Sequence, residues 1–336
     1  MLIYKFLHQA ITLLTFAALA SVLLFTACND VDDTVVEVNA VHNAAEDVHL
    51  FEMSAHEIPN GWTTFQFNNA SAYDHFFLVF KLPEEGIEAA EAAGEPFLDH
   101  WFHNITEPFQ LAYDPYIDGD IDYDTFAENL VAALSQGAPW FFDPGAPAMG
   151  GPGFTAAGAT SETTIYLDPG EYVVECYVKN EDELFHSYIG MLEHLSVTEE
   201  ASGTEEPEPS YSVTISSSGG IQADQDLNRG RHTIEIFFED QVPYAHFLGH
   251  NVQLVKLSDK EDEELLRKLA NWMDWRYPGS LVNRAPEGAE FMGGTMEMTE
   301  GATAYFHVDL EMGDYAWIAE VPDPADHDML KTFTVE

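Results

Sequence analysis

Basic residues are scarce in this sequence. It contains 12 Lys and Arg against 59 Asp and Glu, a formal net charge of −47. From Thr34 to Val197 the only cations besides histidine are Lys81 and Lys179. Such a surface repels phosphate backbones and anionic headgroups, which excludes nucleic acid as a partner. It is typical of halophilic adaptation, since salt at about 1 M shortens the reach of the repulsion to about 3 Å. The acidity therefore describes habitat more than mechanism.

Several catalytic motifs are also missing. The sequence has no Gly-rich phosphate loop, no nucleophile elbow, no His-x-Glu-x-x-His metal helix and no His-x-His pair. Its hydrophobic content of 46% is ample for packed cores, and 336 residues favour two domains. We therefore expect a folded protein that is not an enzyme of these classes.

The N-terminus has the features of an export signal. Lys5 precedes an uncharged apolar run from Ala10 to Ala27, which ends in Phe25-Thr26-Ala27-Cys28. This ending resembles a bacterial lipobox, although Phe25 stands where an aliphatic residue is usual. The resemblance implies a signal peptide over residues 1–28 and lipid attachment at Cys28. An uncleaved membrane helix is the alternative, because the run is nearly long enough to span a bilayer.

Both interpretations place the chain after Asn29 outside the cytoplasm. We therefore expect a lipid-anchored protein on the extracytoplasmic face of the cell envelope, periplasmic or at the cell surface, with the membrane as one partner. Cys28 and Cys176 are the only cysteines, so a lipidated Cys28 leaves no internal disulfide. A single free thiol in an oxidising compartment is a liability unless it is buried or binds a metal.

The mature chain reads as two copies of one pattern. Strand-like segments occupy residues 62–67, 75–82, 163–167, 172–178 and 191–197, and residues 84–136 are predicted to contain a helical insertion. A polar linker, 199–210, follows. The signals then recur in order: His250–Leu257 repeats His75–Leu82, a helical segment covers 261–275, and Gly313-Asp314-Tyr315 repeats Gly170-Glu171-Tyr172. We interpret this as a tandem duplication, with domains at 29–198 and 211–336.

One set of residues in the first copy has metal-binding chemistry. A predicted strand ends at Cys176 and is preceded by the run Asp168-Pro169-Gly170-Glu171-Tyr172. Nine residues then separate Cys176 from His186, and four residues separate His186 from Met191. A thiolate and two imidazoles in a plane, with a weak axial thioether, are the ligands of a mononuclear blue-copper site. His75, after an Asn-containing turn, supplies the second imidazole.

This pattern resembles the cupredoxin family, the plastocyanin and azurin type of copper protein. The resemblance implies an all-β fold of two antiparallel Greek-key β-sandwich domains, each with a helical insertion. It also implies one copper ion in the first domain, with His75, Cys176 and His186 as equatorial ligands and Met191 as the axial ligand. The Cys-to-His loop is longer than is common in small family members, and Phe76 stands where the family commonly has an Asn.

The second copy lacks the thiolate. Ala319 stands at the position of Cys176, so His250, His327 and Met329 are relic counterparts or at most a site for a soft ion. Taken singly, Cys176 and Met191 also suit a plain hydrophobic core. The sequence thus predicts an electron carrier or copper holder with a possible redox partner protein. Two alternatives stay open: a copper-free binding or structural module, and an enzyme with a metal between the domains.

Overall fold

The computed structural model describes residues 35–43, 48–223 and 227–336. These residues belong to one compact unit. The expected signal peptide, 1–28, and its Cys28 lie outside the described residues. Within the described ranges, no helix is both long and apolar enough to cross a membrane.

The first half of the described chain contains strands and a long helical insertion. The strands are β1 (Val35–Asn43), β2 (Val48–Met53), β3 (Glu57–Asn69), β4 (Leu78–Lys81), β5 (Thr160–Leu167), β6 (Gly170–Glu175) and β7 (Leu192–Ala201). The insertion between β4 and β5 contains α1 (Glu84–Ala93), α2 (Phe97–Trp101), a π-helical turn (Phe102–Thr106), α3 (Glu107–Ile117), α4 (Tyr123–Gly137) and a 3-10 turn (Pro139–Phe141).

The second half repeats this order with a shorter insertion. It contains β8 (Tyr211–Ser216), β9 (Gly220–Ala223), β10 (Gly230–Phe238), β11 (Val252–Leu257), α5 (Glu263–Met273), β12 (Ala289–Thr295), β13 (Thr303–Leu310), β14 (Gly313–Ile318) and β15 (Leu330–Val335). β7 extends three residues into the segment expected to be a linker, 199–210.

Most strand pairings of the first half recur in the second half; the exceptions are β3–β7 in the first half and β11–β12 in the second. In the first half β1 pairs with β2 and β3, β3 with β5, and β6 with both β4 and β7. In the second half β8 pairs with β9 and β10, β10 with β13, and β14 with both β11 and β15. The expected fold class, two cupredoxin-like β-sandwich repeats with a helical insertion in each, is confirmed by this correspondence. The pairing is antiparallel except at β1–β3, β8–β10 and the short β3–β7 contact.

The two repeats share a sheet. β5 pairs antiparallel with β13, which joins β3 and β5 to β13 and β10 in one continuous sheet. Isolated bridges from Met149 to Met298 and from Thr155 to Met292 continue the contact beside it. Rings also pack across it, with Phe154 centred 5.0 Å from Phe291. The halves are therefore fused by backbone hydrogen bonds and a common core, and the outer sheets, β4-β6-β7 and β12-β11-β14-β15, complete the two sandwiches.

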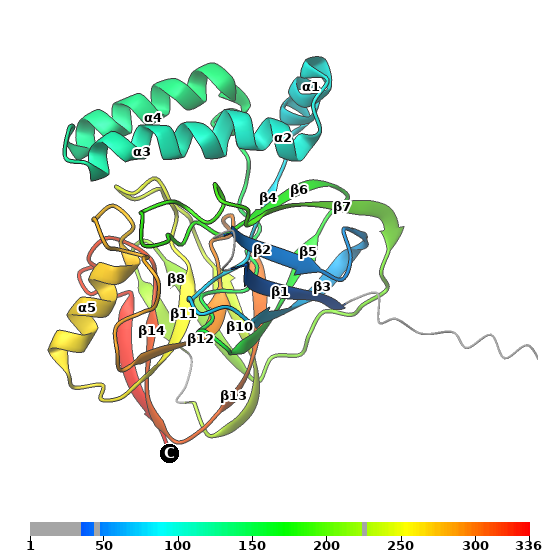
Figure 1. Cartoon of the computed structure of the whole chain (residues 1–336). Coiled ribbons are helices and arrows are strands. Elements are labelled where there is room, and N and C mark those ends of the chain that lie inside the picture. Colours follow the sequence, from blue (N-terminus) through cyan, green and yellow to red (C-terminus); the bar gives the residue numbers. More distant parts are fainter. Residues whose placement is uncertain (1–34, 44–47, 224–226) are drawn as a thin grey trace, which may run out of the picture. The chain divides into compact units, whose positions relative to one another are not determined.

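The helical insertion of the first repeat covers one end of the molecule. In Figure 1, α1 to α4 lie together above β4, β6 and β7, whereas α5 lies apart at the left. α4 begins where the Asp122 side chain accepts a hydrogen bond from the backbone N–H of Thr125 at 2.9 Å, and it buries Phe126, Leu130 and Leu134 at helical spacing. Tyr113 of α3 donates a hydrogen bond to the backbone oxygen of Trp275 at 3.1 Å, so the insertion also packs on the second repeat.

The expected strand over 75–82 is shorter than predicted. Only residues 78–81 form β4, and His75 lies in an isolated bridge with Thr155. The partner segment is irregular because Gly151, at φ 115°, packs so closely on the backbone oxygen of Phe77 that a Cβ atom there would lie 2.2 Å from it. His75 is thus held in a constrained loop next to the sheet.

Candidate metal centre

The four expected ligands come from three segments at one end of the first repeat. His75 lies shortly before β4, Cys176 follows directly after β6, and His186 and Met191 lie in the loop that leads into β7. All four residues are completely buried. Cys176 is a free cysteine.

The donor atoms of three of these residues converge. Cys176 Sγ lies 3.6 Å from His75 Nδ1, and His186 Nδ1 lies 3.2 Å from the same nitrogen. An ion about 2.0 Å from each nitrogen and about 2.3 Å from sulfur would make angles of roughly 105–115° at these separations, which suits trigonal or tetrahedral coordination. Each of these two separations therefore suits a copper or zinc-sized ion held by His75 together with Cys176 or with His186.

Met191 is placed beside this triangle by its backbone. Its N–H donates to the backbone oxygen of His186 at 2.8 Å, and its own carbonyl accepts a hydrogen bond from the Cys176 N–H at 3.3 Å. The structure thus brings the Met191 backbone to two of the ligands. The contacts that define the cluster involve the two imidazoles and the thiol, not the thioether.

A third histidine, His49 on β2, belongs to the cluster and was missed by the sequence reasoning. Ligand nitrogens of His49, His75 and His186 all lie within 4.8 Å of one another. The His49 ring stacks on His186 with centroids 3.9 Å apart, and His42 stacks on His49 at 4.2 Å. His42 and His49 are directly paired across the β1–β2 hairpin. The sequence signal for this stack was the pair of histidines in two short apolar segments on either side of residues 44–47, which the sequence analysis did not assign to strands.

The imidazoles are held neutral. Burial lowers the pKa of His75 and His186 well below the usual range, and the neighbouring histidines lower both further. Their Nε2 atoms are buried without a hydrogen-bond partner among the described residues. Neutral imidazoles with converging Nδ1 atoms are the form in which histidine binds a metal.

The thiol is protonated in the metal-free protein. Burial raises the pKa of Cys176 to about 12, while backbone hydrogen bonds from Phe76 and Val178 act in the opposite direction. These N–H groups do not depend on the side chain at position 76, so the Phe in place of the family's usual Asn leaves the hydrogen bonds to sulfur intact. Metal binding at this cysteine would release its proton.

The long Cys-to-His loop is closed by its own polar residues. Asn180 Oδ1 accepts hydrogen bonds from the N–H groups of Asp182 and Leu184, both at 3.0 Å. The His186 N–H then donates to the backbone oxygen of Val178 at 2.7 Å. The extra residues therefore form a compact turn, and His186 returns to the cysteine despite the unusual spacing.

The counterparts in the second repeat do not form a comparable cluster. His250 Nε2 lies 3.0 Å from the backbone oxygen of Asp240, and Tyr244 OH lies 3.4 Å from His250 Nδ1 and 3.9 Å from Met329 Sδ. The His327 ring packs against the same tyrosine at 5.3 Å. Tyr244 thus lies among the three residues, and the described part of the second repeat shows no cluster of three His, Cys, Asp or Glu side chains placed to share a metal ion.

The second repeat instead retains the asparagine that the first repeat lacks. Asn251 follows His250, and its side-chain oxygen accepts a hydrogen bond from the N–H of Glu320 at 2.8 Å. Glu320 comes directly after Ala319, the counterpart of Cys176. In the second repeat, which has no thiolate, this hydrogen bond therefore links the segment before β11 to the segment after β14.

Comparison with known proteins gives limited information. No family model and no curated protein matches the sequence. The chain is similar in structure to reduced auracyanin from Roseiflexus castenholzii, at 18% identity over 49% of this chain and 97% of that chain, with a TM-score of 0.24. It is also similar to a copper nitrite reductase from Nitrosomonas europaea, at 9% identity over 90% and 93% of the two chains, with a TM-score of 0.23.

Proposed function

We propose that this protein is a lipid-anchored, extracytoplasmic copper-binding protein that carries single electrons or holds copper, with one mononuclear site in the first repeat. The observation that carries the proposal is that Cys176 Sγ and His186 Nδ1 both lie within 3.6 Å of His75 Nδ1. Bound copper would supply the Cu(II)/Cu(I) couple. The protein would supply a thiolate, two neutral imidazoles and a site closed to water.

The histidine stack supports electron transfer over simple storage. His186 is completely buried, and His49 and then the half-buried His42 stack outward from it. Aromatic rings in van der Waals contact provide a short path from the site toward the surface. A redox partner protein would dock where His42 is accessible.

Metal stoichiometry with matched variants tests the proposal. Purified mature protein is expected to bind one copper ion per chain, and His75→Ala to reduce that to none. His250→Ala, the same change at the equivalent position of the second repeat, is the control and is expected to retain the ion. Absence of copper from the parent protein would favour the copper-free structural module, and equal copper binding in the parent and His75→Ala would contradict the proposed site.

Anchoring is tested separately. Cells that express the protein in the presence of a labelled fatty acid are expected to incorporate the label, and Cys28→Ser is expected to abolish it. Labelling that survives this substitution would contradict lipid attachment at Cys28. A membrane-bound protein without label would favour the uncleaved helix.

A further inference from the structure

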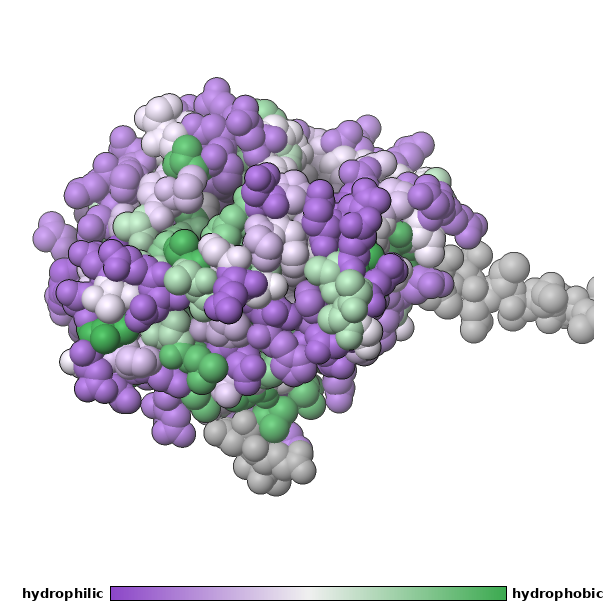
Figure 2. Space-filling model, turned by 90° about the horizontal axis from the view of Figure 1, so that it is seen from above, coloured by the Kyte–Doolittle hydropathy of each residue, from purple (hydrophilic) through white to green (hydrophobic). Residues whose placement is uncertain are grey.

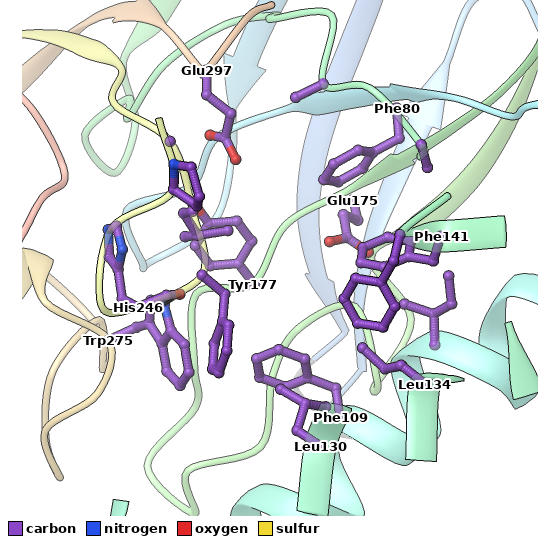
Figure 3. A pocket seen from close by; sticks show the side chains of 18 of the residues that line it. Phe80, Phe109, Leu130, Leu134, Phe141, Glu175, Tyr177, His246, Trp275 and Glu297 are labelled. Carbon is purple, nitrogen blue, oxygen red and sulfur yellow. Dashed lines mark hydrogen bonds between the residues drawn. The ribbon is translucent and has the colours of Figure 1, made fainter. Parts of the chain in front are cut away.

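A large cavity lies between the helical insertion and the second repeat, and its lining includes the chain neighbours of Cys176 (Glu175, Tyr177) and of His186 (Phe185, Ser187). Its volume is about 680 Å³, within the range of small-molecule sites. Aromatic side chains from both repeats form its walls, including Phe80, Trp101, Phe109, Tyr177 and Trp275. Figure 3 shows rings from opposite sides facing the open space.

The cavity opens to the surface through an apolar rim. Four of its lining residues are large hydrophobic side chains with at least 37% exposure: Val131, Phe142, Val242 and Phe247. In Figure 2, hydrophobic residues gather in and around a recess on the face seen from above, within a largely hydrophilic surface. An apolar entrance on so acidic a protein costs solubility, so it indicates a ligand with an apolar body.

A buried carboxyl group points into this cavity. Glu297 is only 5% exposed, and its Oε2 atom has no hydrogen-bond partner among the described residues. In Figure 3 the carboxyl groups of Glu297 and Glu175 face the interior from different walls. Glu175 accepts a hydrogen bond from the Trp101 indole at 3.3 Å. Glu297 is thus a buried acceptor that lacks a donor, which native interiors rarely tolerate.

No basic side chain within the cavity neutralises these acids. Neither lysine nor arginine occurs among the described residues that line it. His246 is the one lining imidazole, but its Nε2 lies 2.7 Å from the backbone oxygen of Glu320, and burial lowers its pKa to about 4. A positive charge that meets Glu297 inside the cavity would therefore come from a ligand.

We propose that this cavity binds a protonated primary amine with an apolar, aryl-sized body. The ammonium group would donate hydrogen bonds to Glu297, and the body would lie among the aromatic walls. Ammonium groups are attracted to the faces of aromatic rings as well as to carboxylates. The aromatic walls of the cavity and Glu297 therefore favour the same class of ligand. The inference does not depend on copper.

Binding of four matched probes to the metal-free protein tests this inference. They are 2-phenylethylamine, its N,N,N-trimethyl derivative, 2-phenylethanol and phenylacetate, measured by calorimetry and by fluorescence of the tryptophans in the walls. The amine is expected to bind at least tenfold more tightly than the alcohol, because the alcohol lacks the charge. The trimethyl derivative keeps the charge but has no N–H donor and is expected to be intermediate. Phenylacetate is expected not to bind.

Two variants locate the ammonium group. Glu297→Gln preserves the shape of the side chain and is expected to weaken amine binding at least tenfold without changing 2-phenylethanol binding. The control, Glu88→Gln at an exposed position of α1, is expected to leave both affinities unchanged. Val131→Lys places a fixed cation at the exposed rim, where it cannot disturb the core, and is expected to weaken amine binding at least threefold. Absence of saturable amine binding, equal affinity for the alcohol, or an unchanged amine affinity in both cavity variants would overturn the proposal.

Discussion

The carboxyl group of Glu297 is expected to destabilise the folded protein at neutral and alkaline pH. Burial raises its pKa from 4.5 to about 7. The folded state holds the Glu297 proton more tightly than the unfolded state does. The contribution of Glu297 to the free energy of unfolding is therefore greatest below pH 4.5 and is lost as the pH rises through 7. Replacement by Gln removes the ionisation, so Glu297→Gln should be more stable than the parent protein at high pH.

The size of the effect follows from the pKa difference. A shift from 4.5 to about 7 corresponds to about 3 kcal/mol of free energy of unfolding at pH 8 and under about 1 kcal/mol at pH 5. The gain in Glu297→Gln should therefore grow by about 2 kcal/mol between these two pH values. Such a gain at the cost of a ligand group is the usual trade between stability and function.

Denaturant unfolding of the metal-free protein at pH 5 and pH 8, in constant salt, measures this difference. Glu88→Gln, on the exposed surface of α1, is the matched control, and its free energy of unfolding should follow that of the parent protein at both pH values. An equal gain at both pH values, or a loss of stability at pH 8, would refute the assignment of Glu297 as a buried, uncompensated acid.

Three further outcomes are expected. His49→Phe should keep the visible absorption of the copper-loaded protein but slow electron exchange with small redox reagents, and loss of the absorption would instead make His49 a ligand. Lys179→Met should cost about 1–3 kcal/mol because Lys179 is buried and bonded to Tyr113 and Glu183. Lys256 is only partly buried and pairs with Glu311 at the surface, so Lys256→Met should cost under about 1 kcal/mol. Similar costs in denaturant unfolding would contradict this. Tyr172→Phe and Tyr315→Phe each remove a hydrogen bond from the tyrosine hydroxyl to the backbone oxygen four residues upstream. Each substitution should lower the free energy of unfolding by about 1 kcal/mol, and the two effects should add. Unequal effects would indicate that the two repeats differ at this position.

The repeated order of strands was the part of the fold that the sequence predicted best. Gly170-Glu171-Tyr172 and Gly313-Asp314-Tyr315 begin β6 and β14, which occupy equivalent places in the two repeats. These segments carry strong local signals, since a glycine at φ above 150° starts each strand and the tyrosine anchors it. The pairing of β5 with β13, which joins the repeats, was not predictable. The local sequence of a strand does not show whether its free edge will pair with the equivalent strand of the other repeat.

The candidate site was predictable as a set of residue types and not as a geometry. Cys176 and His186 lie close in sequence to β6 and β7, so the strand pattern placed them at one end of the sandwich. His49 lies on a different hairpin, and its position follows from tertiary packing of that hairpin over the site. The cavity with Glu297 was equally hidden, because its walls come from the helical insertion of one repeat and a loop of the other.

The most direct test of the copper proposal is the visible absorption of purified mature protein loaded with Cu(II). A thiolate ligand is expected to give an intense sulfur-to-copper charge-transfer band. Cys176→Ala should abolish the band, and His250→Ala should leave it unchanged. Absence of the band under every loading condition, or its persistence in Cys176→Ala, would contradict a blue-copper site at Cys176.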